Sequence, residues 1–153
     1  TPHTPAIQAQ FTQYFDDLSQ GADLSLQVVI NHRTVHALRH TENAIWFDFD
    51  TLCNTPRSQN DYLVLARNYQ TIFLTQMPVL RVQDAQAARR FTWLIDVLYD
   101  QKVKLFLSAA AAPEALYIEG PFSQEFVRTA SRLTEMQSQE YLNETFAQRQ
   151  RLP

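Results

Sequence analysis

The sequence predicts an α/β fold: a mixed sheet with an N-terminal helix and a β-hairpin, followed by a βαβ unit and a C-terminal helix. Apolar residues recur at helical spacing over residues 5–20, and a strand, a helix and a second strand succeed one another over residues 71–110. The 153 residues are 45% hydrophobic and 12% aromatic, enough for a sizeable core. We therefore predict a single domain over residues 1–153, with a helix-and-hairpin subregion (5–50) and an α/β subregion (51–145).

The first subregion begins with an amphipathic helix over residues 5–20, and Gly21 is suited to end it because glycine accepts a left-handed backbone. Residues 24–30 and 34–40 flank a short polar turn and predict two strands. Residues 44–50 alternate along the chain and predict a third strand with polar residues on one side. We expect these three strands to pair in an antiparallel or mixed arrangement.

Helices and strands alternate in the second subregion. Ser58 can cap a helix over residues 60–69 through its hydroxyl oxygen, and residues 71–75 predict a short apolar strand. Asp84 can cap a long helix over residues 85–101, whose apolar residues form one stripe.

Another apolar strand is predicted over residues 103–110, and together with 71–75 it forms a strand–helix–strand unit. Such units join parallel strands through a right-handed crossover. After this unit, residues 113–117 predict a short helical turn and residues 123–142 a final long helix.

Composition and charge exclude several function classes. The formal net charge is −3 and the basic residues are scattered, so we predict no nucleic-acid partner. A single cysteine, Cys53, permits neither an internal disulfide nor a zinc site with two thiolates, and it fits a reduced, cytoplasmic setting. We predict no membrane span, since no apolar run approaches roughly 18 residues, and no signal peptide is present. The chain starts with TPHTP and no methionine, so we expect a fragment or a processed piece.

Glycine content argues against a nucleotide-binding loop in this chain. Gly21 and Gly120 are its two glycines and lie far apart, so neither GxxxxGK[ST] nor GxGxxG can be written from the sequence. Such loops need glycine because several backbone N–H groups must approach the phosphates closely. We therefore predict that this chain alone holds no cofactor and does not hydrolyse ATP.

Two sets of side chains have metal-binding spacing. His32, His36 and His40 lie four residues apart, as metal ligands on a helix do, but their segment also fits the solvated surface of a hairpin. Asp48 and Asp50 are expected on one strand face, where they either hold a divalent cation or form an acidic solvated surface.

Two nucleophilic side chains also have a structural and a functional interpretation. Cys53 is either a buried structural thiol or a nucleophile, although no activating base lies near it in the sequence. Ser108 comes at the end of a predicted strand, where open α/β sheets bind ligands, but the same small residues also allow close packing.

Arginine pairs are candidates for binding an acidic partner. Arg128 and Arg132 stand one turn apart on the last helix, where Glu125 and Glu135 are in reach for intrahelical ion pairs. Either those pairs satisfy both arginines, or the arginines reach a group outside the chain. The Arg89–Arg90 dipeptide opposes the dipole at the start of its helix, which also hints at an acidic partner.

Several blocks of the sequence resemble a known family. In order, these blocks are "FDFDTLC", "RSQNDY", "ARRF", "LIDVLYD", "VKLFLSA" and "SRLTEMQSQEYL". They resemble the C-terminal part of the ZapE family, which comprises bacterial cell-division-associated ATPases and their mitochondrial relatives with an AAA-type P-loop core. The resemblance extends from about Ile45 to Leu142 and more loosely over the N-terminal helix and hairpin.

The resemblance implies that the fold is similar to part of a P-loop ATPase core whose nucleotide-binding half is absent here. In the family the phosphate loop and the acidic strand end that holds magnesium lie upstream, so ATP and Mg belong to the complete protein. The strand in "TIFLTQMPVL" has a similar place but ends in Gln76, Met77 and Pro78 instead of two acids. Implied partners are the N-terminal ATPase half, further copies in a homo-oligomer, and FtsZ.

On the same basis, Arg128 or Arg132 is a candidate trans-acting or sensor arginine, because a guanidinium fork matches phosphate oxygens. Arg57 and Arg90 also fall in family blocks, with interface or packing contacts as their expected roles. Two alternatives stay open at this point. One is a stand-alone adaptor domain that uses Trp46, Trp93 or the N-terminal helix; the other is an independent enzyme acting near Ser108.

Overall fold

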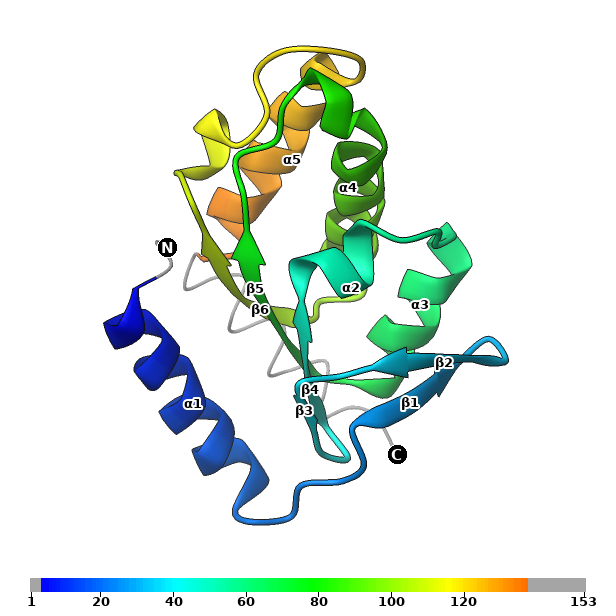
Figure 1. Ribbon diagram of the computed structural model, residues 1–153, viewed down its shortest axis with the longest axis vertical. Helices are drawn as coiled ribbons and strands as arrows, with labels where there is room; N and C mark the ends of the chain where they lie inside the picture. Colours follow the sequence, from blue (N-terminus) through cyan, green and yellow to red (C-terminus); the bar gives the residue numbers. More distant parts are fainter. Residues whose placement is uncertain (1–3, 138–153) are drawn as a thin grey trace.

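The computed structural model describes residues 4–137 (Figure 1). Its helices are α1 (Pro5–Ser19), α2 (Phe49–Cys53), α3 (Gln59–Asn68), α4 (Ala85–Asp100) and α5 (Ser123–Glu135), with short 3-10 turns η1 (Val82–Asp84) and η2 (Pro113–Ala115). Its strands are β1 (Gln27–Ile30), β2 (Arg33–His36), β3 (Arg39–His40), β4 (Ala44–Asp48), β5 (Thr71–Met77) and β6 (Lys104–Ala109).

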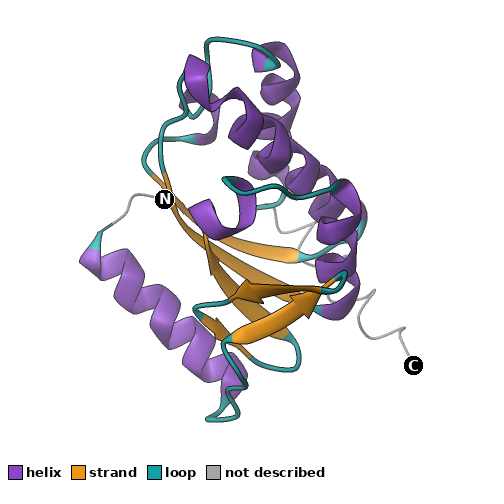
Figure 2. Ribbon diagram, turned by 45° about the vertical axis from the view of Figure 1, so that its right-hand side comes forward, coloured by secondary structure: helices purple, strands orange, loops and turns teal. Residues whose placement is uncertain are grey.

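The main sheet has the strand order β3-β4-β5-β6, with α1 on one face and α3, α4 and α5 on the other (Figure 2). Strands β4, β5 and β6 run parallel, and β3 pairs antiparallel with β4. The predicted mixed α/β sheet is therefore confirmed, including the βαβ unit β5-α4-β6. A second parallel connection, from β4 through α2 and α3 to β5, was not predicted.

A ladder of aromatic side chains covers the α1 face of the sheet. Parallel register places Trp46 beside Phe73 and Phe73 beside Phe106, with centroid separations of 5.3 Å and 4.5 Å between the stacked rings. Phe11 and Phe15 of α1 pack edge-on or tilted against these rings. A parallel sheet needs cover on both faces, and on this side one helix supplies it.

Charge fixes the end of α1 to the edge strand. Arg39 of β3 donates to Asp16 of α1 at 2.7 Å and to Asp23 at 2.7 and 3.0 Å. Its guanidinium also lies over the Phe15 ring, 4.5 Å from the centroid. The hydrogen bonds from Arg39 lower the pKa of Asp23 against a smaller opposing effect of burial.

The first strands differ from the sequence prediction in one respect. Residues 34–40 do not form one strand: β2 pairs with β1 in a hairpin of its own, and β3 crosses to the main sheet. Asn31 and His32 both have positive φ, as a tight two-residue hairpin turn requires. The chain divides after His36 because Ala37 and Leu38 donate to different strands or loops, at Leu26 and Trp46 respectively.

The prediction for residues 44–50 was wrong in its last two positions. Strand β4 ends at Asp48, and Phe49 begins the short helix α2, so Asp48 and Asp50 do not share a strand face. Nor is the strand polar on one side: Trp46 is 2% exposed, and its indole N–H donates to the Thr75 hydroxyl at 3.0 Å. Both faces of β4 are buried because helices cover both sides of the sheet.

Helix ends follow the predicted capping only in part. Ser58 caps α3 in a reciprocal capping box with Asp61, as predicted. Asp84 does precede α4, but its carboxylate accepts from the backbone N–H of Arg81 and so caps η1 instead. Helix α5 starts at Ser123 as predicted but ends at Glu135, since Met136 and Gln137 form a turn; residues 138–142 of the predicted helix lie outside the described residues.

Replacing Phe15 tests whether α1 is an integral layer. Phe15→Ala should lower the free energy of unfolding by about 3–5 kcal/mol, because Phe15 is fully buried against Trp46 and Phe73. Leu18→Ala, on the exposed side of the same helix, should change it by less than about 0.5 kcal/mol. Urea denaturation measures both, and equal losses for the two variants would mean that α1 does not dock on the sheet.

Candidate functional site

One carboxylate on α4 holds both candidate arginines of α5. Arg132 Nη1 donates to one oxygen of Asp96, and Arg128 Nη2 lies 3.3 Å from the other. The intrahelical pairs with Glu125 and Glu135 that the spacing suggested are not the contacts found. The arginines turn toward α4 because the two helices pack closely there.

The packing of α4 on α5 determines this geometry. Thr129 donates its hydroxyl to that of Thr92 at 3.1 Å in the buried contact, and Phe91 stacks on Phe126 with centroids 6.0 Å apart. Asp96 follows Thr92 by one turn of α4, so it meets the flank of α5 that carries Arg128 and Arg132.

The two arginines have different surroundings. The Arg132 side chain is 24% exposed, and its guanidinium lies over the Tyr99 ring at 4.8 Å from the centroid. Tyr99 in turn donates to Glu135, and this hydrogen bond raises the pKa of Tyr99. The Arg128 side chain is 61% exposed. Arg132 is thus largely enclosed in the helix contact, whereas the side chain of Arg128 is mostly exposed to solvent.

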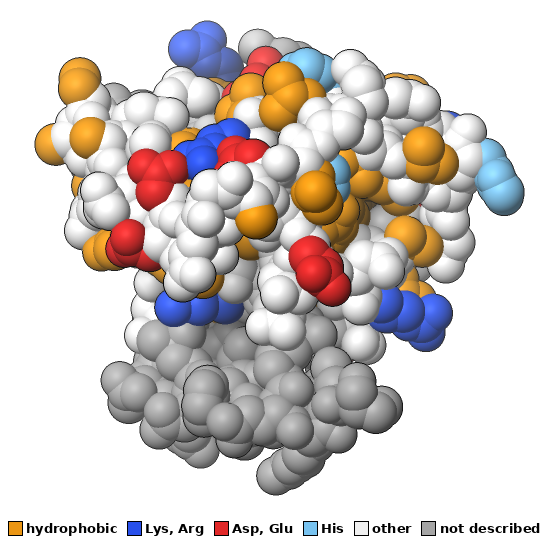
Figure 3. Space-filling model, turned by 90° about the horizontal axis from the view of Figure 1, so that it is seen from below, with side chains coloured by type: hydrophobic (Ala, Val, Ile, Leu, Met, Phe, Trp, Pro, Cys, Tyr) orange, Lys and Arg blue, Asp and Glu red, His pale blue; other side chains and the backbone are white. Residues whose placement is uncertain are grey.

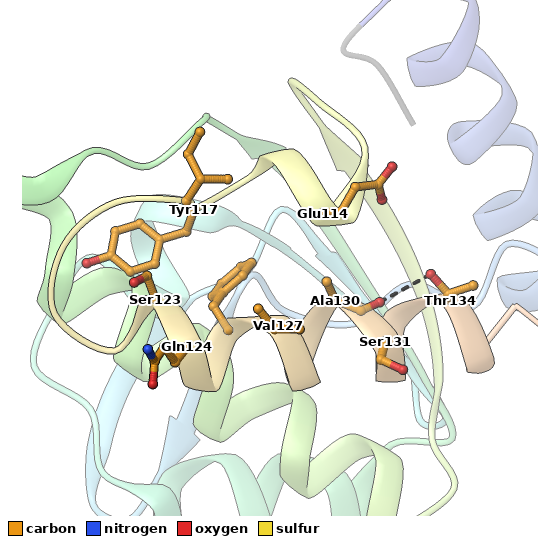
Figure 4. A pocket seen from close by; sticks show the side chains of 10 residues that line it. Glu114, Tyr117, Ser123, Gln124, Val127, Ala130, Ser131 and Thr134 are labelled. Carbon is orange, nitrogen blue, oxygen red and sulfur yellow. Dashed lines mark hydrogen bonds between the residues drawn. The ribbon is translucent and has the colours of Figure 1, made fainter.

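An apolar groove lies along a neighbouring side of α5, where Val127 directly precedes Arg128 (Figure 4). It has a volume of about 430 Å³ and runs between α5 and the loop around η2. Ile118 and Val127 line it and are 69% and 71% exposed, while Tyr117 forms part of its buried floor. Exposed aliphatic side chains beside a hollow are typical of a protein contact. Sequence reasoning did not identify this groove, since its residues come from a loop and a helix.

Polar groups at the carboxyl ends of the strands are used within the fold. Ser108 is 3% exposed, and its hydroxyl accepts from the backbone N–H of Gln76, a residue with positive φ at a register shift between β5 and β6. Ser108 thus stabilises an irregular strand end. Because its hydroxyl is buried and hydrogen-bonded, it is not available as a nucleophile, so the alternative of an enzyme acting there is not supported.

Cys53 is a buried structural thiol. It is fully buried, and that burial raises the pKa of the thiol to about 12. A hydrogen bond with Tyr62, followed by the charges of Arg90 and Arg57, opposes this effect without outweighing it. A thiol that stays protonated and inaccessible does not act as a nucleophile.

The remaining acids and histidines do not assemble a metal site. Within residues 4–137 no three His, Cys, Asp or Glu side chains are close enough to hold a metal ion. His32 lies in the hairpin turn, His36 contacts Gln27 at 3.2 Å, and His40 contacts the carbonyl of Ser25. Burial, followed by the neighbouring Asp50, raises the pKa of Asp48.

Basic side chains do not form one continuous patch on the face seen in Figure 3. On the face in Figure 3, lysine and arginine side chains lie apart, with acidic side chains between them. Arg89 lies over the rings of Trp93 and Phe122, at 4.8 and 5.1 Å from their centroids. Arg57 and Arg90 donate to backbone carbonyls at the end of α2. None of the helices described over residues 4–137 is long and apolar enough to cross a membrane.

The described residues thus form a mixed α/β sheet flanked by helices, with an interhelical arginine pair on the α4–α5 contact. Residues 1–145 match the family model for AFG1-like ATPases, so the chain belongs to that family. This confirms the family resemblance, because the relatives named ZapE match as well.

The curated relatives are much longer than this chain. It is 40% identical over 113 residues to the "Cell division protein ZapE" of Escherichia coli (strain K12), covering 74% of this chain and 30% of that protein. It is 33% identical over 116 residues to the "Uncharacterized protein C115.02c" of Schizosaccharomyces pombe, covering 76% of this chain and 25% of that protein. The chain thus spans less than a third of either relative. No solved structure matches it.

The thiol provides a direct check of this site description. Iodoacetamide at mildly alkaline pH should leave Cys53 of the folded chain unmodified, because burial keeps the thiol protonated and inaccessible. The same reagent should modify the urea-unfolded chain completely. Mass spectrometry reads both states without ambiguity, since Cys53 is the single cysteine of the sequence. Rapid modification of the folded chain would contradict the structural assignment.

Proposed function

We propose that this chain is the C-terminal region of a ZapE-like ATPase and that it supplies Arg128 to an ATP site formed by the rest of the protein. The observation that carries the proposal is the exposed side chain of Arg128, whose Nη2 lies 3.3 Å from a carboxylate oxygen of Asp96 on α4. Family membership supports the ATPase activity of the longer protein, and ATP and Mg²⁺ would be bound upstream of this chain.

Asp96 and Arg132 would act as positioning residues in this arrangement. The closer Arg132 contact occupies one oxygen of Asp96 and fixes the carboxylate, so the second oxygen restrains Arg128 at 3.3 Å without enclosing it. An arginine that is oriented but accessible can turn toward the phosphates of a neighbouring subunit with little ordering cost. An arginine buried in the helix contact could not, which is why we assign the trans-acting role to Arg128 and the bracing role to Arg132.

The apolar groove would be the contact surface for the ATPase half or a second copy. Val127 is adjacent to Arg128 in α5, so a partner seated against Val127 and Ile118 would lie close to the arginine. Apolar contact would provide the binding affinity, and the contact would bring Arg128 close to the ATP site. By the name of the E. coli relative, the longer protein would serve cell division. The family resemblance described above would add the cytoplasm as its location and FtsZ as a partner.

The adaptor alternative is best supported at the groove along α5. Trp46 is buried and offers no free binding surface, and α1 packs its aromatic side chains Phe11 and Phe15 against the sheet. The groove along α5 could still bind a partner protein without any role in hydrolysis. Arg128 distinguishes the two functions, because an adaptor that uses the groove would not require this arginine.

Substitution of Arg128 in the full-length protein tests the proposal. Arg128→Ala should lower kcat for ATP by roughly 10³-fold with little change in nucleotide affinity, since a trans-acting arginine stabilises the transferring phosphoryl group. Arg128→Lys should restore little, because an ammonium lacks the planar fork.

The control is Arg67→Ala, an exposed arginine on α3, which should leave turnover unchanged. Arg132→Ala should lower the unfolding midpoint as well as turnover, because it removes the brace from Asp96. Full turnover by Arg128→Ala would leave the adaptor as the supported function.

A further inference from the structure

Three arginines from separate parts of the chain surround one groove. Arg33 begins β2, Arg57 lies in the loop before α3, and Arg90 lies in the second turn of α4. All three line a groove of about 650 Å³. Its wall also contains Trp93 of α4, which is partly buried.

Each of these guanidiniums uses a backbone carbonyl as its hydrogen-bond acceptor. The acceptors lie in one short segment, at Pro56 for Arg33, Thr51 for Arg57 and Cys53 for Arg90, with distances of 3.2 to 3.4 Å. The segment that ends α2 therefore gathers the three positive charges. A guanidinium has several N–H donors, so most donors remain for another acceptor.

In the described part of the chain, none of the three guanidiniums forms a direct ion pair with a carboxylate. Within residues 4–137, neither Arg33 nor Arg57 nor Arg90 has an Asp or Glu oxygen at ion-pair distance, unlike Arg39 and Arg132. The Arg57 Nε atom is moreover buried without a hydrogen-bond partner in this part of the chain. A buried, charged donor without an acceptor is costly, so its persistence indicates a missing acceptor.

Asp61 also lines this groove, but its carboxylate accepts hydrogen bonds from groups other than the three arginines. Its carboxylate accepts from Asn31 Nδ2 at 2.7 Å and from the backbone N–H of Ser58 at 3.0 Å. Burial would raise its pKa, but these hydrogen bonds, with the charges of Arg33 and Arg57, outweigh burial and lower it. Asp61 thus links the hairpin tip to the N-terminus of α3 and does not occupy the N–H donors of the arginines.

We propose that this groove binds the phosphate group of a small phosphorylated molecule, a nucleotide or a free polyphosphate. Guanidinium forks match phosphate oxygens in pairs, and the N-terminal end of α3, where Ser58 and Asn60 line the groove, adds a favourable dipole. The groove has the size of a small-molecule pocket, which favours such a ligand over an extended acidic peptide. Trp93 offers an apolar surface for the remainder of the ligand.

This site is independent of the proposed ATPase function. The chain lacks a glycine-rich phosphate loop, so phosphate binding by the chain alone reports the groove and nothing upstream. Arg128 and the apolar groove lie on α5, whereas the three-arginine groove is formed by the hairpin, the α2–α3 loop and α4. Failure of one proposal therefore leaves the other untouched.

The two tryptophans give the test an internal reference. Titration of the isotope-labelled 153-residue chain with pyrophosphate should shift the indole N–H resonance of Trp93, which lines the groove. The resonance of Trp46, buried on the other face of the sheet, should stay in place. Parallel titrations with ATP and inorganic phosphate distinguish the sources, since a tighter ATP complex identifies a nucleotide and equal affinities identify the phosphate group alone.

Arginine variants locate the binding. Arg57→Gln and Arg90→Gln should each weaken pyrophosphate binding at least about tenfold, as expected for loss of a charge-assisted hydrogen bond. Arg33→Gln should weaken it too, and because Arg33 is exposed it provides a variant that keeps its fold. Arg67→Gln, outside the groove, is the matched control and should bind as the parent does.

Two results would overturn the proposal. One is the absence of any Trp93 shift at millimolar pyrophosphate, or a shift that all three variants retain. The other is an oligoglutamate peptide that shifts Trp93 while pyrophosphate does not, which would assign the groove to an acidic protein segment.

Discussion

The burial of both faces of a short parallel sheet is the constraint on which this structure depends. On one face, Trp46, Phe73 and Phe106 stack in register and α1 covers them with two phenylalanines, while Arg39 ties that helix to the sheet edge. On the other face, α3 and α4 pack directly on the strands and α5 packs on α4. Because parallel strands tolerate no open face, the helices that carry the arginines have fixed positions relative to the sheet.

Both charged sites follow from those positions. The α4–α5 contact brings Asp96 against Arg132, which is largely enclosed in that contact, and against Arg128, which is exposed. The start of α4, the α2–α3 loop and the hairpin tip meet around another group of arginines, which donate to backbone carbonyls within residues 4–137. The strand ends, where related folds often place their chemistry, are occupied by internal hydrogen bonds such as that of Ser108.

Helices, caps and strands that neighbouring residues determine were predictable from the sequence, whereas contacts between residues far apart in the chain were not. The period of α1 and α4, the Ser58 cap and the βαβ unit were read correctly because neighbouring residues determine them. The division of residues 34–40 and the end of β4 at Asp48 were missed, since both depend on pairing with distant strands. Spacing likewise gave Arg128 and Arg132 glutamate partners within α5, whereas the contact with Asp96 exists only once α4 packs. No signal marked Arg33 as a neighbour of Arg57 and Arg90.

The central claim is that Arg128 acts across a subunit boundary on an ATP site that this chain does not contain. Its most direct test mixes two inactive full-length proteins, one with Arg128→Ala and one in which the lysine of the upstream phosphate loop is replaced. If the arginine acts in trans, mixed oligomers regain ATP turnover, because an intact site meets an intact arginine. Turnover in the mixture that never exceeds the sum of the separate proteins would contradict the account.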